Sequence, residues 1–98
     1  MSVTTEMDDS KAISCLPRTT ESYRLSDHAR NRFKQRSRLM NGSMLRSILT
    51  EGEISPGDEP GKAHIESTFM NITFTLVVAL KPGNDGVHTI VTLFHSRR

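Results

Sequence analysis

Residues 71–95 read NITFTLVVALKPGNDGVHTIVTLFH, and this stretch decides the expected fold. Its first ten residues alternate as a strand does, and five apolar side chains share one face: Ile72, Phe74, Leu76, Val78 and Leu80. Residues 82–86 are turn formers, and residues 87–95 are again rich in β-branched and aromatic side chains. The stretch therefore predicts two antiparallel strands joined by a hairpin loop.

The residues before this hairpin predict one short strand followed by two helices. Residues 22–25 alternate over the length of a strand, and Ser26 is a good N-cap for a helix over about residues 27–38. Ser43 is the expected N-cap of a second, shorter helix. We expect Gly52 to end that helix in the left-handed conformation.

Two further strands complete the expected order. Residues 53–55 form a short strand, and residues 62–69 form a polar strand that we place at an edge of the sheet. The predicted class is α+β: a short N-terminal strand, and two helices packed on one face of an antiparallel sheet of about four strands.

The chain divides into two predicted regions. Residues 1–20 are rich in Ser, Thr and acidic side chains, so we expect a flexible N-terminal arm. Residues 21–98 form the single α+β domain. The alternative for the arm is that Ile13, Cys15 and Leu16 dock on the domain or on a partner.

The small net charge of +2 over 98 residues hides a strong segregation of charge. Residues 18–50 hold eight Lys and Arg against two acidic residues, whereas residues 1–17 hold one against three and residues 51–98 hold four against six. Five of the eight cations lie within nine residues: Arg30, Arg32, Lys34, Arg36 and Arg38. A short element with charge of one sign attracts a polyanion, so these five residues are the candidate nucleic-acid-binding residues.

Several classes of protein do not fit the sequence. The single cysteine, Cys15, excludes an internal disulfide and a paired-cysteine zinc site, so we expect a cytoplasmic protein with no metal and no cofactor. No apolar run reaches the length of about 18 residues that a membrane span needs, and we expect no membrane partner. No pair of carboxylates has the spacing of a glycosidase or metal site.

One stretch resembles a known family. Residues 23–30, which read Tyr-Arg-Leu-Ser-Asp-His-Ala-Arg, followed by Phe33 and Arg36, resemble the SxHAxxRxxxR opening of a widespread uncharacterised small-domain family, which is similar to the RelE and BrnT ribonuclease toxins. The resemblance extends over residues 23–94, through a second helix that ends in glycine to a final strand of the VxTv type at residues 90–93. Residues 37–38 depart from it, because Ser-Arg stands where the family has an aromatic residue or glycine.

The resemblance implies a RelE-like fold and a metal-independent endoribonuclease, in which the ribose 2′-hydroxyl attacks the adjacent phosphate. That reaction needs a base, an acid and cations for the developing charge. The candidate catalytic residues are His28, Arg32, Arg36 and His95, with the two histidines as an acid–base pair and the arginines on phosphate. The alternatives are structural: His28 packs between helix and sheet, and His95 is a solvated end of the strand.

The same resemblance leaves the roles of the other cations open. Arg30, the arginine at the family position, is either an RNA ligand or a structural partner of Asp27 or of a carboxylate on the sheet. Lys34 and Arg38 are either RNA ligands or a solvated face. We expect His88 to lie too far along its strand to share a site with His95, and His64 to be merely exposed.

The expected function is a small toxin-like domain that binds RNA and is a possible endoribonuclease. The alternative is a binding or inhibitor module of a mobile element or virus, which acts on a nucleic-acid complex or a protein through its basic helix. A third possibility is one half of a toxin–antitoxin pair, with the basic surface covered by an acidic antitoxin or another protein partner.

Overall fold

The hairpin predicted over residues 71–95 forms the centre of a five-stranded sheet. β4 (Ile72–Ala79) and β5 (His88–Arg97) pair antiparallel in the computed structural model, which describes residues 10–36 and 38–97. Gly86 in the connecting loop has a φ of 79°, a left-handed value that glycine adopts without steric cost.

A β-bulge explains why apolar residues of β5 do not alternate. Val77 lies opposite Thr92, whereas the next residue, Val78, lies opposite Ile90, so β5 carries one extra residue at this point. The bulge brings Ile90 and Leu93, three positions apart, to the same buried side, and each is only 1% exposed.

The other three strands add to the two sides of the hairpin in the order β1-β5-β4-β3-β2. These are β1 (Tyr23–Leu25), β2 (Glu53–Pro56) and β3 (Lys62–Phe69). The sheet has five strands rather than about four, and β3 is an interior strand rather than an edge, because β2 pairs along its outer side. The expectation of a wholly antiparallel sheet is also wrong, since β1 runs parallel to β5. Two helices and three strands separate β1 from β5 along the chain, so no hairpin imposes an antiparallel pairing on them.

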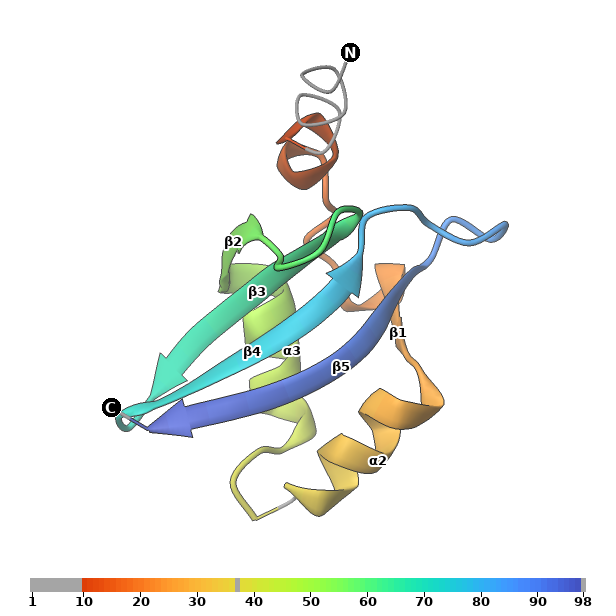
Figure 1. The fold of residues 1–98 in the computed structure, drawn as a ribbon. Coiled ribbons are helices and arrows are strands. Elements are labelled where there is room, and N and C mark those ends of the chain that lie inside the picture. The colour runs from red at the N-terminus through yellow and green to blue at the C-terminus, as the bar shows by residue number, and fades with distance from the viewer. Residues whose placement is uncertain (1–9, 37, 98) are drawn as a thin grey trace.

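Two helices cover one face of this sheet (Figure 1), which confirms the α+β class. They are α2 (Asp27–Gln35) and α3 (Gly42–Glu51); a 3-10 turn, η1 (Thr20–Ser22), precedes β1, and residues 10–14 are also helical. The core lies between the helices and the sheet and includes Ala29, Ile48, Ile65, Phe74, Leu76 and Leu93.

The N-cap predicted for α2 is confirmed, and the one predicted for α3 is wrong. The hydroxyl oxygen of Ser26 accepts a hydrogen bond from the backbone N–H of Ala29 at 3.0 Å. For α3 the cap is Asn41 rather than Ser43, because the Asn41 side chain accepts from the N–H of Met44 at 2.9 Å. Asparagine is as good a cap as serine, and the helix begins two residues earlier than a cap at Ser43 would allow.

Gly52 ends α3, but not in the expected left-handed conformation. Its φ of −66° and ψ of 161° are extended values that any residue adopts. The glycine is needed for space instead: a Cβ atom at this position would lie 2.5 Å from the carbonyl oxygen of Ile48 and 2.9 Å from the side chain of Ile65. The chain turns from α3 into β2 against β3, and only glycine fits there.

Part of the region predicted as an arm contacts the domain. Leu16 is buried in the core, with 6% exposed, and the Tyr23 hydroxyl donates to the carbonyl of Pro17 at 2.7 Å. The guanidinium group of Arg18 donates to the carbonyl groups of Thr50 and Gly52 at the end of α3. Leu16 thus docks on the domain, as the alternative for the arm predicted. Residues 1–9 of the predicted arm lie outside the described residues.

Candidate nucleic-acid interface

The basic helix lies along a free edge of the sheet. β1 is only three residues long, so it leaves the later carbonyl groups of β5 without a strand partner on that side. Side chains at the start and middle of α2 supply donors instead: the Ser26 hydroxyl donates to the carbonyl of Val91 at 2.8 Å, and Arg32 Nε donates to the carbonyl of Leu93 at 3.4 Å. α2 is thereby fixed beside β5, and Arg32 has a structural contact that the sequence did not reveal.

The end of α2 brings one arginine to the imidazole of His95 and to the backbone of Arg32. Arg36 Nε donates to Nδ1 of His95 at 2.9 Å, and Arg36 Nη1 donates to the carbonyl of Arg32 at 3.4 Å. Burial lowers the pKa of the Arg36 guanidinium, and the charge of Arg32 adds to the effect. We call Arg32, Arg36 and His95 the Arg36–His95 cluster.

This contact fixes which nitrogen of His95 carries the proton. A guanidinium group can only donate hydrogen bonds, so Nδ1 of His95 must accept and the ring proton lies on Nε2. The nitrogen of His95 that is left to donate is therefore Nε2. Two guanidinium groups and one N–H donor form an arrangement that suits an anion such as a phosphate.

His28 lies one helical turn before Arg32 of this cluster, but two turns before Arg36, which is the residue that contacts His95. His28 is exposed and lies eight residues before Arg36, which corresponds to about 12 Å along a helix. The helix therefore places Arg36, and not His28, beside His95. The other two histidines lie elsewhere: His88 is buried against Tyr23 with Nδ1 2.8 Å from the carbonyl of Ala79, and His64 lies edge-on to Phe94.

The remaining cations of α2 face solvent. Arg30 and Lys34 are exposed and stand one helical turn apart, and Arg38 is exposed just beyond the helix. Within the described part of the chain the one ion pair joins Arg24 to Asp85 at 2.9 Å, so the pairing of Arg30 with Asp27 is not formed. These three cations keep their charge available for a partner.

The open face of the sheet has a different character. A hollow of about 330 Å³ on this face is lined by the carboxylates of Asp58 and Glu59 beside Lys62 and by the rings of His64 and Phe94. A third carboxylate, that of Glu66, accepts from the hydroxyl of Thr75 at 3.3 Å. A polyanion is repelled by such a face, so the helix side is the surface that suits one.

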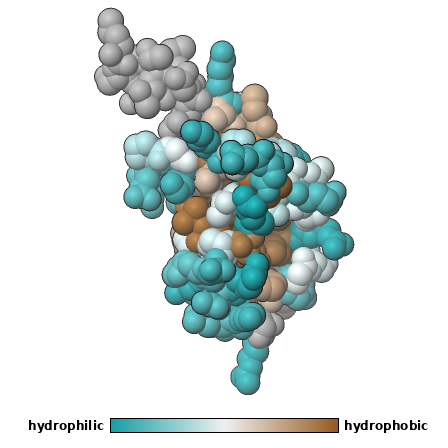
Figure 2. Space-filling view, turned by 90° about the vertical axis from the view of Figure 1, so that its right-hand side faces the viewer, coloured by the Kyte–Doolittle hydropathy of each residue, from teal (hydrophilic) through white to brown (hydrophobic). Residues whose placement is uncertain are grey.

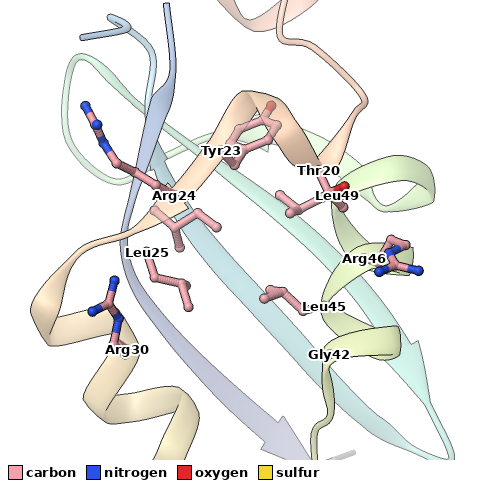
Figure 3. A pocket seen from close by; sticks show the side chains of 10 residues that line it. Thr20, Tyr23, Arg24, Leu25, Arg30, Gly42, Leu45, Arg46 and Leu49 are labelled. Atoms are coloured by element: carbon pink, nitrogen blue, oxygen red, sulfur yellow. The ribbon is translucent and has the colours of Figure 1, made fainter. Parts of the chain in front are cut away.

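A groove between the helices holds cations that the sequence analysis did not select. It measures about 410 Å³ and is lined by side chains from η1, β1, α2, α3 and β5, with Arg30 joined by Arg24 and Arg46 (Figure 3). The signal for them was the excess of cations over residues 18–50, which contains both arginines, although neither lies on α2. Arg46 also has an acidic neighbour: a hydrogen bond from Thr20 lowers the pKa of the Glu21 carboxyl, and the charge of Arg46 adds a smaller contribution.

Metal and membrane sites are not seen among the residues that the structure describes. No cluster of three or more His, Cys, Asp or Glu side chains in residues 10–36 and 38–97 could hold a metal ion. In the same residues no helix has the length and apolar character of a membrane span.

Comparison with known proteins adds no relative. No family model, no curated protein and no solved structure matches this chain. The resemblance to the RelE and BrnT toxins therefore stays a prediction.

Proposed function

We propose that the protein binds RNA through α2 and the adjoining end of β5. The observation that supports this proposal most directly is the set of exposed cations Arg30, Lys34 and Arg38, which form no ion pair with any described carboxylate. Phosphate groups supply the missing counter-charge, and each contact releases counterions from the nucleic acid. The Arg36–His95 cluster adds three donors at the end of the same helix.

The contacts of Arg32 and Arg36 also explain how this surface keeps its shape. Both side chains are half-buried and tied to β5, so little conformational entropy remains to be lost when they bind a phosphate. Arg30, Lys34 and Arg38 are free to follow a flexible strand. The Arg36–His95 cluster therefore positions a bound phosphate, and the exposed cations attract the RNA over a longer range.

A matched pair of variants tests binding. The triple variant Arg30→Gln, Lys34→Gln, Arg38→Gln removes the exposed cations near α2, and the triple variant Lys11→Gln, Lys62→Gln, Lys81→Gln removes the same charge elsewhere. Measured by fluorescence anisotropy with a labelled single-stranded RNA at low salt, the first should weaken binding on the order of tenfold or more. The second should bind nearly as wild type does. Equal losses in the two variants would contradict the assignment to α2.

The predicted endoribonuclease activity is a separate proposal, and the cluster supports only part of it. The two guanidinium groups suit the developing negative charge. The N–H of a neutral imidazole is too weak an acid to protonate a leaving oxygen, so a His95 ring that accepts from Arg36 is suited to donate a hydrogen bond to a phosphate and not to act as the general acid. A base for the 2′-hydroxyl is missing beside His95 as well, because His28 lies two helical turns before Arg36. The observations favour the non-catalytic alternative, in which the cluster binds phosphate and does no more.

Cleavage is tested with total RNA in EDTA. If the protein cleaves RNA, Arg36→Gln should reduce the rate by about 10²–10³-fold, the usual cost of removing one group that stabilises the developing charge, and His28→Ala should leave it nearly unchanged. Binding without cleavage would establish the non-catalytic module instead. Cleavage that needs His28 as much as Arg36 would contradict these roles.

A further inference from the structure

The groove between α2 and α3 combines an apolar floor with a cationic rim. The floor is formed by Leu25 of β1, Leu45 and Leu49 of α3, and Ile90 of β5. Leu25 and Leu45 point toward each other across the groove, with Arg30 on the α2 side and Arg46 on α3 (Figure 3). Seen from the side of β1 and α2, hydrophobic surface lies in the middle of the molecule with hydrophilic side chains around it (Figure 2).

The charges around the groove indicate an anionic occupant. Three arginines line it, no aspartate or glutamate does, and only Arg24 of the three has an ion-pair partner in the described residues. Its volume of about 410 Å³ is within the range of about 300–1,000 Å³ that is usual for small-molecule sites. A ligand that suits this groove has a flat apolar part that contacts the leucines and negative charges that contact the arginines.

We propose that this groove receives one unstacked base of a single-stranded RNA, with Arg30 and Arg46 contacting the flanking phosphates. The inference rests on the proposed function and deepens it, because Arg30 belongs to both α2 and the groove. A strand that follows the cations of α2 thus reaches the groove without leaving the basic surface. Arginine side chains can contact a phosphate or stack on a base, and single-stranded RNA exposes both.

The affinities of the protein for single-stranded and for double-stranded RNA distinguish insertion of a base from simple attraction by charge. Charge alone favours the duplex, since its phosphates are more closely spaced. Insertion of a base favours the single strand, because the bases of a duplex are stacked and paired. We expect a preference for single-stranded RNA on the order of tenfold, which corresponds to about 1.4 kcal/mol.

Gly42 allows the groove to be filled without disturbing the fold. It lines the groove at the start of α3, and a Cβ atom placed on it meets no other atom within 4 Å. The variant Gly42→Leu should fold and occupy the space proposed for the base. Ser43→Leu is the matched control, because Ser43 is the next residue, is exposed and does not line the groove.

The experiment uses a short single-stranded RNA with a central 2-aminopurine, whose fluorescence rises when the base leaves its stack, and a duplex of the same sequence. Wild type and Ser43→Leu should raise the fluorescence and prefer the single strand, whereas Gly42→Leu should bind RNA through α2 without either effect. Binding by wild type with no fluorescence change and no preference for the single strand would overturn the inference and leave the proposed function standing. Absence of binding to both RNAs would overturn the two together. If Gly42→Leu and Ser43→Leu reduced the rise in 2-aminopurine fluorescence to the same extent, that result would also contradict a site in the groove.

Discussion

Ser26 connects a helix to a strand through a single hydroxyl group. Its oxygen accepts from the N–H of Ala29 and its proton is donated to the carbonyl of Val91 on β5. Ser26→Ala removes both hydrogen bonds, and we expect the free energy of unfolding to fall by about 1–2 kcal/mol. Urea denaturation measures the loss. Ser43→Ala is the control, because Ser43 is exposed and does not cap α3, and it should change stability by less than about 0.5 kcal/mol.

The proton on His95 is placed by one neighbouring side chain. With Arg36 Nε donating to Nδ1, the neutral ring carries its proton on Nε2. Arg36→Glu replaces the donor by an acceptor, so the proton should move to Nδ1. Long-range ¹H–¹⁵N spectra distinguish the two tautomers when recorded near pH 9, where imidazole is ordinarily neutral. The same tautomer in both proteins would contradict the contact, provided the amide spectrum shows that the variant is folded.

The glycines at the two ends of α3, Gly42 and the C-cap Gly52, differ in the space that they leave for a side chain. At Gly52 an added methyl group would lie 2.5 Å from the carbonyl oxygen of Ile48, whereas at Gly42 it would meet nothing within 4 Å. We expect Gly52→Ala to destabilise the protein by about 1–3 kcal/mol, the usual cost of overpacking. Gly42→Ala should stabilise it by about 0.5 kcal/mol, because alanine restricts the unfolded chain without strain. Urea midpoints of the two variants should therefore move in opposite directions from that of the wild type.

The elements that the sequence predicts well are those whose pattern is local. The alternation of residues 71–80 and the turn formers of residues 82–86 are sufficient for the β4–β5 hairpin, and Ser26 is sufficient for the start of α2. The turn between β3 and β4 is local as well, since the strands predicted over residues 62–69 and 71–80 leave only residue 70 between them. Asn71 has a φ of 70°, a left-handed value that asparagine adopts more readily than most residues, whereas Met70, with a φ of 51°, gives no such signal.

The elements that the sequence predicts poorly depend on distant contacts. β1 is parallel to β5 because of the route of the whole intervening chain, and β3 is interior because β2 folds back on it. For the candidate site, the basic residues of α2 could be selected from composition. The contact of Arg36 with His95 could not, since it joins residues 59 positions apart and depends on the register of β5 after its bulge.

At the scale of the molecule, the fold turns a charge pattern along the chain into two different surfaces. The cations of residues 18–50 lie on the helix side of the sheet, around α2 and the groove beside it. Carboxylates of residues 51–98, including Asp58, Glu59 and Glu66, belong to the opposite face and its neighbouring loop. Net charge is therefore a poor guide to attraction here, because a polyanion near one side of the protein meets mainly one sign.

This separation predicts how salt acts on RNA binding. Each phosphate contact contributes about 0.7 to the slope of log affinity against log salt for a single strand, so removing three contacts should reduce the slope by about 2. We expect that reduction in Arg30→Gln, Lys34→Gln, Arg38→Gln, with titrations repeated from low to moderate salt. The variant that removes Lys11, Lys62 and Lys81 has the same net charge, so its slope should equal that of the wild type if local contacts with α2 determine binding. Equal reductions in the two variants would mean that the overall charge of the protein, rather than this surface, attracts the RNA.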